Sequence, residues 1–217
     1  MLQQRPRSTA SPNWRQLPFQ VYLSHAHEDF LLVERVWRIL DHIGIRSFMY
    51  EHFPHPGRTP CDAVLGAIED SAQVVPFLTA AGVRSPWLQQ ELGAAIALGK
   101  QLLPVVQVDA VQSPGFTDVQ QPVLLDTRHP ELAIGHLLWL LRVDFEVFEG
   151  RVTLECPGCH AYSEAALPSL HALRRAMDGN HLLEGFACRS CGAAARLSPL
   201  TLEPVSEQMA LGRAWPE

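Results

Sequence analysis

The chain has 217 residues, of which 47% are hydrophobic and 18% charged, and this composition indicates a globular protein rather than a disordered one. Its length suffices for one domain of ordinary size plus a small second one. With a formal net charge of -6 and a pI of about 5.9, it lacks the basic excess that a nucleic-acid binder of this size normally carries, so nucleic acid is not expected as a partner.

The sequence shows no signal for export or membrane insertion. Residues 1–18 are polar and contain prolines, without the apolar core of a signal peptide, and we expect them to form a flexible leader. The longest apolar stretch, around 132–141, is interrupted by His136 and is too short to cross a bilayer. We therefore expect a soluble, cytoplasmic protein without membrane contact.

Five short apolar runs predict the strands of a sheet. Residues 101–108 are nearly all apolar, as expected when both faces of a strand are covered. Pro76 is poorly suited to a central strand because it has no N–H group to donate. The strands are expected at 19–24, 45–50, 73–79, 101–108 and 123–125.

Helices are predicted between these strands. Val33, Val36 and Leu40 mark the buried face of the first helix, which ends at Gly44. Ser85 suits the N-cap of the third helix. The helices are expected at 33–43, 60–70, 85–98 and 131–141. Alternation of strands and helices through short loops predicts an α/β fold, in which helices cover both faces of a parallel sheet.

Beyond residue 143 the pattern changes, and two CxxC pairs stand out. The pairs are Cys156–Cys159 and Cys188–Cys191. In a chain without an export signal such pairs indicate metal ligands rather than disulfides. Four thiolates close a tetrahedral site, which is typical of structural zinc, whereas catalytic zinc keeps one position open. The sequence therefore predicts a structural Zn²⁺ bound by all four cysteines.

The region around the cysteines is predicted to be a zinc-ribbon-like module over 151–200. A helix is expected near 165–177, between the two CxxC pairs, and a tail over 201–217. Positive and negative side chains nearly balance in the module, which does not favour DNA binding. The favoured role of the module is to stabilise the fold or to bind a protein partner through its surface.

Three stretches resemble a TIR (Toll/interleukin-1 receptor-like) domain, in the order and spacing of that family. FQVYLSHAHEDF, which starts at Phe19, is similar to the family's first strand and the loop after it. The loop that ends with His55-Pro56-Gly57 lies where the family has its BB loop. SPWLQQELGAAIALGKQLLPVV, which starts at Ser85, is similar to the family's W-x-x-x-E helix and following strand. The resemblance covers 19–143 and implies a flavodoxin-like TIR fold.

This resemblance also implies a function. TIR domains include enzymes that cleave NAD⁺ and scaffolds that only assemble. The bacterial enzymes act in anti-phage defence as NAD⁺ glycohydrolases or ADP-ribosyl cyclases, and their catalytic glutamate corresponds to Glu91. Self-association through the TIR domain is implied for both classes. Tyr50, where the enzymes often carry aspartate, favours the scaffold, whereas the Trp87–Glu91 pair favours the enzyme.

Around Glu91, the resemblance implies a set of substrate-binding residues. Its members are Ser24, His25 and His27 after the first strand, Tyr50 and Glu51 after the second, Gly57 and Arg58 in the BB loop, and Trp87.

The residue types leave alternatives open for several of these positions. Trp87 either stacks on a substrate ring or packs in the core. His25 and His27 either bond the diphosphate or are exposed turn residues. Arg58 carries a permanent charge, which makes it the better phosphate ligand, unless it is merely solvated.

The helix dipole favours an acid in the first helical turn, but Glu91 lies beyond that turn. It also lies beside an apolar stripe. Its carboxylate is therefore expected either at the rim of a pocket or buried with a partner. A single carboxylate suits NAD⁺ cleavage, because nicotinamide leaves as a neutral molecule and needs no general acid. The site has to supply negative charge near the oxocarbenium-like ribose.

Overall fold

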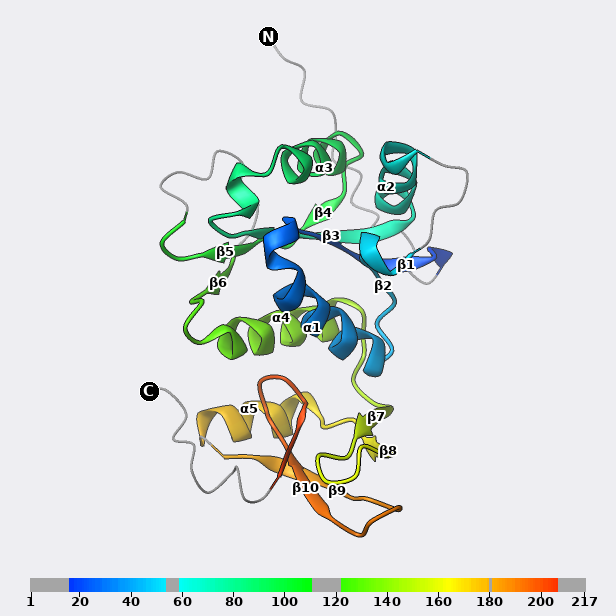
Figure 1. Cartoon of the computed structure of the whole chain (residues 1–217), viewed down its shortest axis with the longest axis vertical. Helices are drawn as coiled ribbons and strands as arrows, with labels where there is room; N and C mark the ends of the chain where they lie inside the picture. Colours follow the sequence, from blue (N-terminus) through cyan, green and yellow to red (C-terminus); the bar gives the residue numbers. More distant parts are fainter. Residues whose placement is uncertain (1–15, 54–58, 111–121, 180, 207–217) are drawn as a thin grey trace.

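The computed structural model describes residues 16–53, 59–110, 122–179 and 181–206, and its larger part is built on a parallel sheet (Figure 1). The strand order is β2-β1-β3-β5-β6, with β4 also paired to β3, and every pairing is parallel. The strands are β1 (Phe19–Ser24), β2 (Ser47–Phe48), β3 (Ser71–Leu78), β4 (Gln101–Leu102), β5 (Val105–Gln107) and β6 (Val123–Leu125).

Four helices cover the two faces of this sheet. In Figure 1 one pair lies above the sheet and the other below it. The upper pair is α2 (Pro60–Glu69) and α3 (Pro86–Ala97), and the lower pair is α1 (Phe30–His42) and α4 (Pro130–Asp144). The expected α/β architecture is thus confirmed. Within the described residues, no helix combines the length and the apolar character needed to cross a membrane.

The two prolines of the central strands explain why one expected strand is divided. Phe77 lies opposite Val105 in the parallel register of β3 and β5, and the same register brings Pro104 opposite Pro76. Neither proline has an N–H group, so the ladder is interrupted there, and the prediction of one continuous strand over 101–108 was wrong at this point. Pro76 itself is accommodated inside β3, where all eight residues are buried.

The second strand is also shorter than the expected 45–50. β2 contains only Ser47 and Phe48, and a 3₁₀ helix, η3 (Tyr50–His52), follows it. Phe53, which follows this 3₁₀ helix, stacks on Phe48, with ring centroids 4.7 Å apart, and is half-buried.

Capping side chains set the starts of α2 and α3. Thr59 Oγ1 accepts a hydrogen bond from the backbone N–H of Asp62 at 3.1 Å. Ser85 Oγ accepts one from the N–H of Leu88 at 3.3 Å. A proline follows each cap at the first helical position, where its missing N–H costs nothing. The expected Ser85 cap is confirmed.

Residues 151–206, the C-terminal module, pack against α1 and α4, below them in Figure 1. The module contains two antiparallel sheets, one of two strands and one of three. Its elements are β7 (Arg151–Glu155), β8 (Tyr162–Ala166), α5 (Leu170–Asp178), β9 (Leu183–Ala187), β10 (Ala194–Leu197) and β11 (Pro204–Ser206). The helix expected at 165–177 begins later, because Ala165 pairs in β8 and Ser169 caps the helix.

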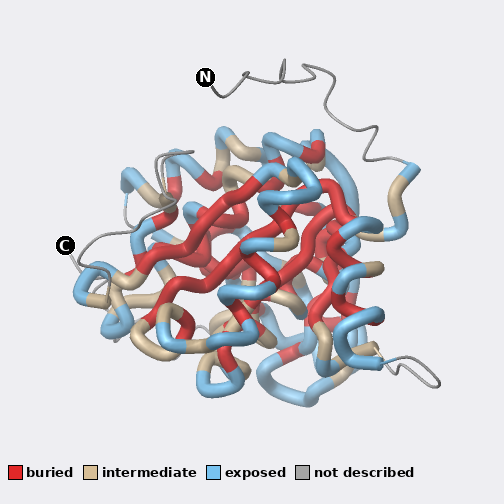
Figure 2. The backbone as a smooth tube through the Cα atoms, turned by 90° about the horizontal axis from the view of Figure 1, so that it is seen from above, coloured by how far each residue is buried: buried red, intermediate tan, exposed pale blue. Residues whose placement is uncertain are grey.

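One hydrophobic core joins the module to the sheet. It contains Val33 of α1 and Leu137 of α4 together with Leu154 and Leu173 of the module. Buried segments, red in Figure 2, run through the middle of the molecule. The contact is close at Gly135, where an added Cβ would lie 3.1 Å from the Cα of Leu200.

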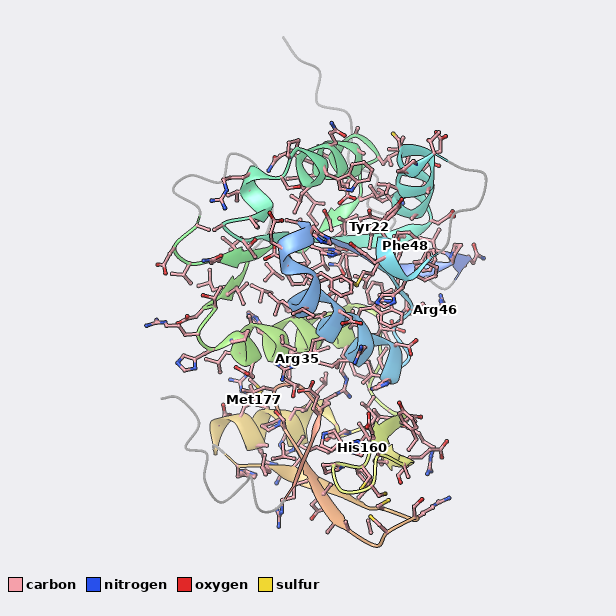
Figure 3. The ribbon with its side chains drawn as sticks, viewed as in Figure 1. Tyr22, Arg35, Arg46, Phe48, His160 and Met177 are labelled. Atoms are coloured by element: carbon pink, nitrogen blue, oxygen red, sulfur yellow. The ribbon has the colours of Figure 1, made fainter. Side chains whose placement is uncertain are left out.

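Charged side chains add specific bonds across the same contact. Arg35 of α1, which faces the module in Figure 3, forms two hydrogen bonds with Glu203, and Nε lies 2.9 Å from Oε1. Arg142 of α4 is fully buried. Its Nε donates to the carbonyl oxygen of Val147 at 2.9 Å, and its Nη2 donates to that of Pro168 at 2.8 Å. The module is therefore held against α1 and α4 by directed hydrogen bonds as well as by apolar packing.

Candidate active site and metal centre

The candidate active site lies at the carboxyl ends of β1 and β3. The chain leaves β1 to form β2 on one side, whereas β3 pairs on the other side. In open parallel sheets this reversal of strand order leaves a crevice in which ligands bind. A cavity of about 370 Å³ is found there, and its lining includes His25, Tyr50, Trp87 and Glu91.

Glu91, on α3, is the buried carboxylate of this cavity, with 4% of its surface exposed. Tyr22 Oη donates to its Oε1 at 2.7 Å, and Ser24 Oγ donates to its Oε2 at 2.5 Å. Burial raises the pKa of Glu91, and the bonds from Ser24, Tyr22 and the Trp87 side chain only partly offset that effect. The carboxylate thus lies beside an open cavity and is held by two hydroxyl donors.

Tyr22 is a site residue that the sequence analysis did not identify. It lies two residues before Ser24 on β1, and side chains two apart on a strand share a face. Its ring stacks on Phe48 of β2, with centroids 5.4 Å apart (Figure 3). Burial, together with the neighbouring Glu91, raises the pKa of Tyr22 well above its ordinary value, so the hydroxyl remains a donor. The alternation of side chains along β1, which puts Tyr22 on the same face as Ser24, could have identified it.

His25 and Glu51 form an ion pair at the cavity wall. The Nε2 of His25 lies 3.4 Å from Oε1 of Glu51, and the imidazole is 4% exposed. Burial lowers the pKa of His25, but the bond with Glu51 and its charge outweigh burial, so the net shift is upward. The same partner lowers the pKa of Glu51. The pair therefore favours the protonated form of an imidazole that lines the cavity.

The remaining expected site residues divide into two groups. His27 is exposed, and Tyr50 lies edge-to-face with Trp87, their ring centroids 6.3 Å apart; all three line the cavity. Trp87 is 39% exposed, which does not support the core-packing alternative. Gly57 and Arg58 lie outside the described residues.

Hydrogen bonds of Thr79 link the two loops that border the cavity. Thr79 Oγ1 donates to Asp29 Oδ2 at 2.6 Å and accepts from the N–H of Gly82 at 2.9 Å. Asp29 ends the 3₁₀ helix η2 (His27–Asp29), and Gly82 begins another, η4 (Gly82–Arg84). The loop after β1 is thereby tied to the turn before α3, which carries Glu91.

The candidate metal centre lies in the C-terminal module, where the four Sγ atoms are all within 4.8 Å of one another. Cys156 Sγ lies 3.7 Å from Cys191 Sγ, and Cys159 Sγ lies 3.6 Å from Cys188 Sγ. These separations exclude disulfides, which bring sulfur atoms to about 2 Å. Tetrahedral zinc with Zn–S bonds of about 2.3 Å requires sulfur atoms about 3.8 Å apart. The donor set and its spacing therefore fit zinc.

Two matching turns present these cysteines. The N–H of His160 donates to Cys156 O, and the N–H of Gly192 donates to Cys188 O, each at 2.9 Å. His160 and Gly192 both have positive φ, 59° and 73°, directly after the second cysteine of each pair. Backbone N–H groups lower the pKa of Cys188, whereas at Cys159 the effect of a backbone N–H is outweighed by bonds with the neighbouring cysteines, which raise the pKa.

Comparison with known proteins identifies one family. A family model described as TIR domain matches residues 21–138, which is more than half of the chain. No curated protein matches the chain.

Solved structures that are similar to parts of the chain include the following three. The TIR domain of the Toll-related receptor TRR-2 from Hydra magnipapillata is 20% identical, with a TM-score of 0.47, over 57% of this chain and 98% of that one. The TIR domains of the activated Roq1 resistosome, which recognises the pathogen effector XopQ, are 23% identical, with a TM-score of 0.39, over 42% and 58%. The CMP N-glycosidase BcmB of Clostridium botulinum is 19% identical, with a TM-score of 0.38, over 58% and 98%.

Proposed function

Because this chain belongs to the TIR domain family, we propose that it is an enzyme that cleaves the nicotinamide–ribose bond of NAD⁺. The proposal rests on one observation above all, a buried Glu91 that faces a cavity and is held by Tyr22 and Ser24. The enzyme is an NAD⁺ glycohydrolase or ADP-ribosyl cyclase, and its resemblance to bacterial TIR enzymes extends the proposal to anti-phage defence.

The chemistry requires little besides a well-placed negative charge. When the C–N bond breaks, its electron pair neutralises the pyridinium nitrogen, and positive charge develops on the ribose. Glu91 stabilises that charge from a buried position, where electrostatic interactions are stronger than in solution. Water, or an adenine nitrogen of the same molecule, then bonds to the ribose carbon, and in hydrolysis a proton is released.

Other residues of the cavity support this role. Tyr50 and Trp87 present aromatic rings that suit the flat nicotinamide or adenine. Glu51, held by His25, supplies a second carboxylate next to Tyr50, the position where enzymatic relatives often have aspartate. His27 lies at the exposed side of the cavity, within reach of the polar part of a substrate.

Glu91→Gln is the decisive variant for this proposal. Glutamine keeps the shape of the side chain but removes its charge, so kcat for NAD⁺ should fall about a hundredfold or more, as when one electrostatic stabiliser is removed. Product formation is measured by chromatography. Glu69→Gln, an exposed glutamate on α2, is the matched control and should retain full turnover. Near-normal turnover by Glu91→Gln would remove Glu91 from the catalytic role.

The second candidate function is a non-enzymatic scaffold that assembles through its TIR domain. Tyr50, in place of aspartate, favours it. Wild-type protein that forms no product at any concentration, including concentrations at which it self-associates, would establish the scaffold in place of the enzyme. In either case we propose that the four cysteines bind a structural zinc ion and that the C-terminal module offers a surface to a protein partner.

A further inference from the structure

The cavity beside Glu91 is lined mainly by acidic charge. Glu28, Glu51 and Glu91 all contribute to its wall. Among the described residues that line it, Arg84 is the one lysine or arginine. NAD⁺ carries a diphosphate that these carboxylates repel, so a bound dinucleotide needs a compensating cation nearby. Arg84 was not identified from the sequence.

The backbone at Arg84 is held firmly in place. Its own N–H donates to Ala81 O at 3.1 Å, within the short helix η4. The turn is pressed against β3 at Gly82, where an added Cβ would lie 2.1 Å from the carbonyl oxygen of Phe77. Arg84 is also the residue before Ser85, the N-cap of α3. The positive end of the helix dipole and Arg84 therefore border the same cavity.

One further observation indicates an anion at this place. Among the described residues, Arg84 takes part in no ion pair, so its charge is not already committed. A ligand with acceptor oxygens in the cavity would supply the missing partner for its guanidinium.

We propose that Arg84, together with the N-terminus of α3, binds the diphosphate of the substrate. The cavity thereby selects nicotinamide nucleotides that carry a 5′-diphosphate over the unphosphorylated nucleoside. This inference rests on the proposed NAD⁺-cleaving function and deepens it. Arg84 sets specificity and takes no part in breaking the bond, which is assigned to Glu91.

The kinetic test compares two substrates that differ in the diphosphate, NAD⁺ and nicotinamide riboside. Arg84→Gln should lower kcat/KM for NAD⁺ about tenfold or more, because a charge-assisted bond is lost, and should leave nicotinamide riboside unchanged. Arg84→Lys should recover part of the loss. Arg174→Gln, an exposed arginine of α5, is the matched control and should change neither value. An equal loss for both substrates, or no loss, would overturn the proposal.

A binding measurement separates this inference from the proposed function. Calorimetry with ADP-ribose and with adenosine requires no turnover. ADP-ribose should bind Arg84→Gln about tenfold more weakly than the wild type, while adenosine affinity stays the same. If ADP-ribose binding depends on Arg84 but NAD⁺ is never cleaved, the phosphate site stands and the enzymatic proposal fails. If ADP-ribose binds both proteins equally, or neither, the phosphate site is refuted.

Discussion

Two opposing influences act on the carboxyl group of Glu91. Burial raises its pKa, while hydrogen bonds from Ser24 and Tyr22 lower it. In the proposed mechanism the ionised form stabilises a cationic transition state, so activity should decline as the pH falls through this pKa. The two hydroxyl groups should therefore extend the proposed activity to a lower pH than burial alone would allow.

Tyr22→Phe tests this balance. Phenylalanine keeps the ring on Phe48 but removes one donor to Glu91, so the pKa of Glu91 should rise. The acid limb of kcat/KM for NAD⁺ should then move to higher pH by about one unit, given what a hydrogen bond to a charged group contributes. Tyr162→Phe, at an exposed position of β8, should leave the profile unchanged. An unmoved acid limb for Tyr22→Phe would mean that the hydroxyl does not tune Glu91.

The sequence predicted some of these residues and missed others for identifiable reasons. Glu91 could be predicted because its helix has a capped start, an apolar stripe and a family motif. Tyr22 resembles any buried strand residue until β1 is placed beside α3. Arg84 resembles a solvated loop residue until η4 is seen against the cavity. Both were missed because proximity in space, rather than residue type, gives them their roles.

At the scale of elements, local signals predicted where structures begin better than where they are interrupted. Ser85 marks the start of α3 because its cap involves only neighbouring residues. Pro104 is a local signal for the break between β4 and β5, because it has no N–H group to donate, but its position opposite Pro76 requires the register. The start of α5 was placed too early because strand pairing holds Ala165 in β8.

The paired turns of the C-terminal module lead to a prediction about metal. Purified wild-type protein should contain about one zinc ion per chain by elemental analysis. Cys156→Ser should lose the ion and unfold residues 151–206, because the binding energy of a structural metal is also folding energy. Hydrogen exchange localises that loss of protection. Cys61→Ser, which alters the cysteine outside the cluster, should keep its zinc. A Cys156→Ser protein that is metal-free and still protected in the module would contradict the assignment.

At the scale of the molecule, Arg142 connects the two parts of the structure. It is a buried cation with backbone carbonyl oxygens as its hydrogen-bond partners, and burial lowers its pKa to about 10. Arg142→Met fills similar space but leaves the carbonyls of Val147 and Pro168 without their donors. The free energy of unfolding should fall by roughly 2–4 kcal/mol, measured by urea denaturation.

Arg128→Met provides the comparison for that variant. Arg128 is exposed and forms an ion pair with Asp126 two residues away, so its loss should change stability by less than about 1 kcal/mol. Equal effects of the two substitutions would show that Arg142 does not join the module to the sheet.

Because α4 is buried both toward the sheet and toward the C-terminal module, the order in which the ribosome delivers the chain matters. All strands of the parallel sheet, and α4 itself, have been synthesised once residue 144 emerges. The side of α4 around Gly135 then stays in contact with water until the loop that contains Leu200 has been made. During that interval the nascent protein presents an apolar helix surface of the kind that chaperones recognise. Completion of the module therefore covers this apolar surface and ends the interval in which residues before 144 are prone to aggregation.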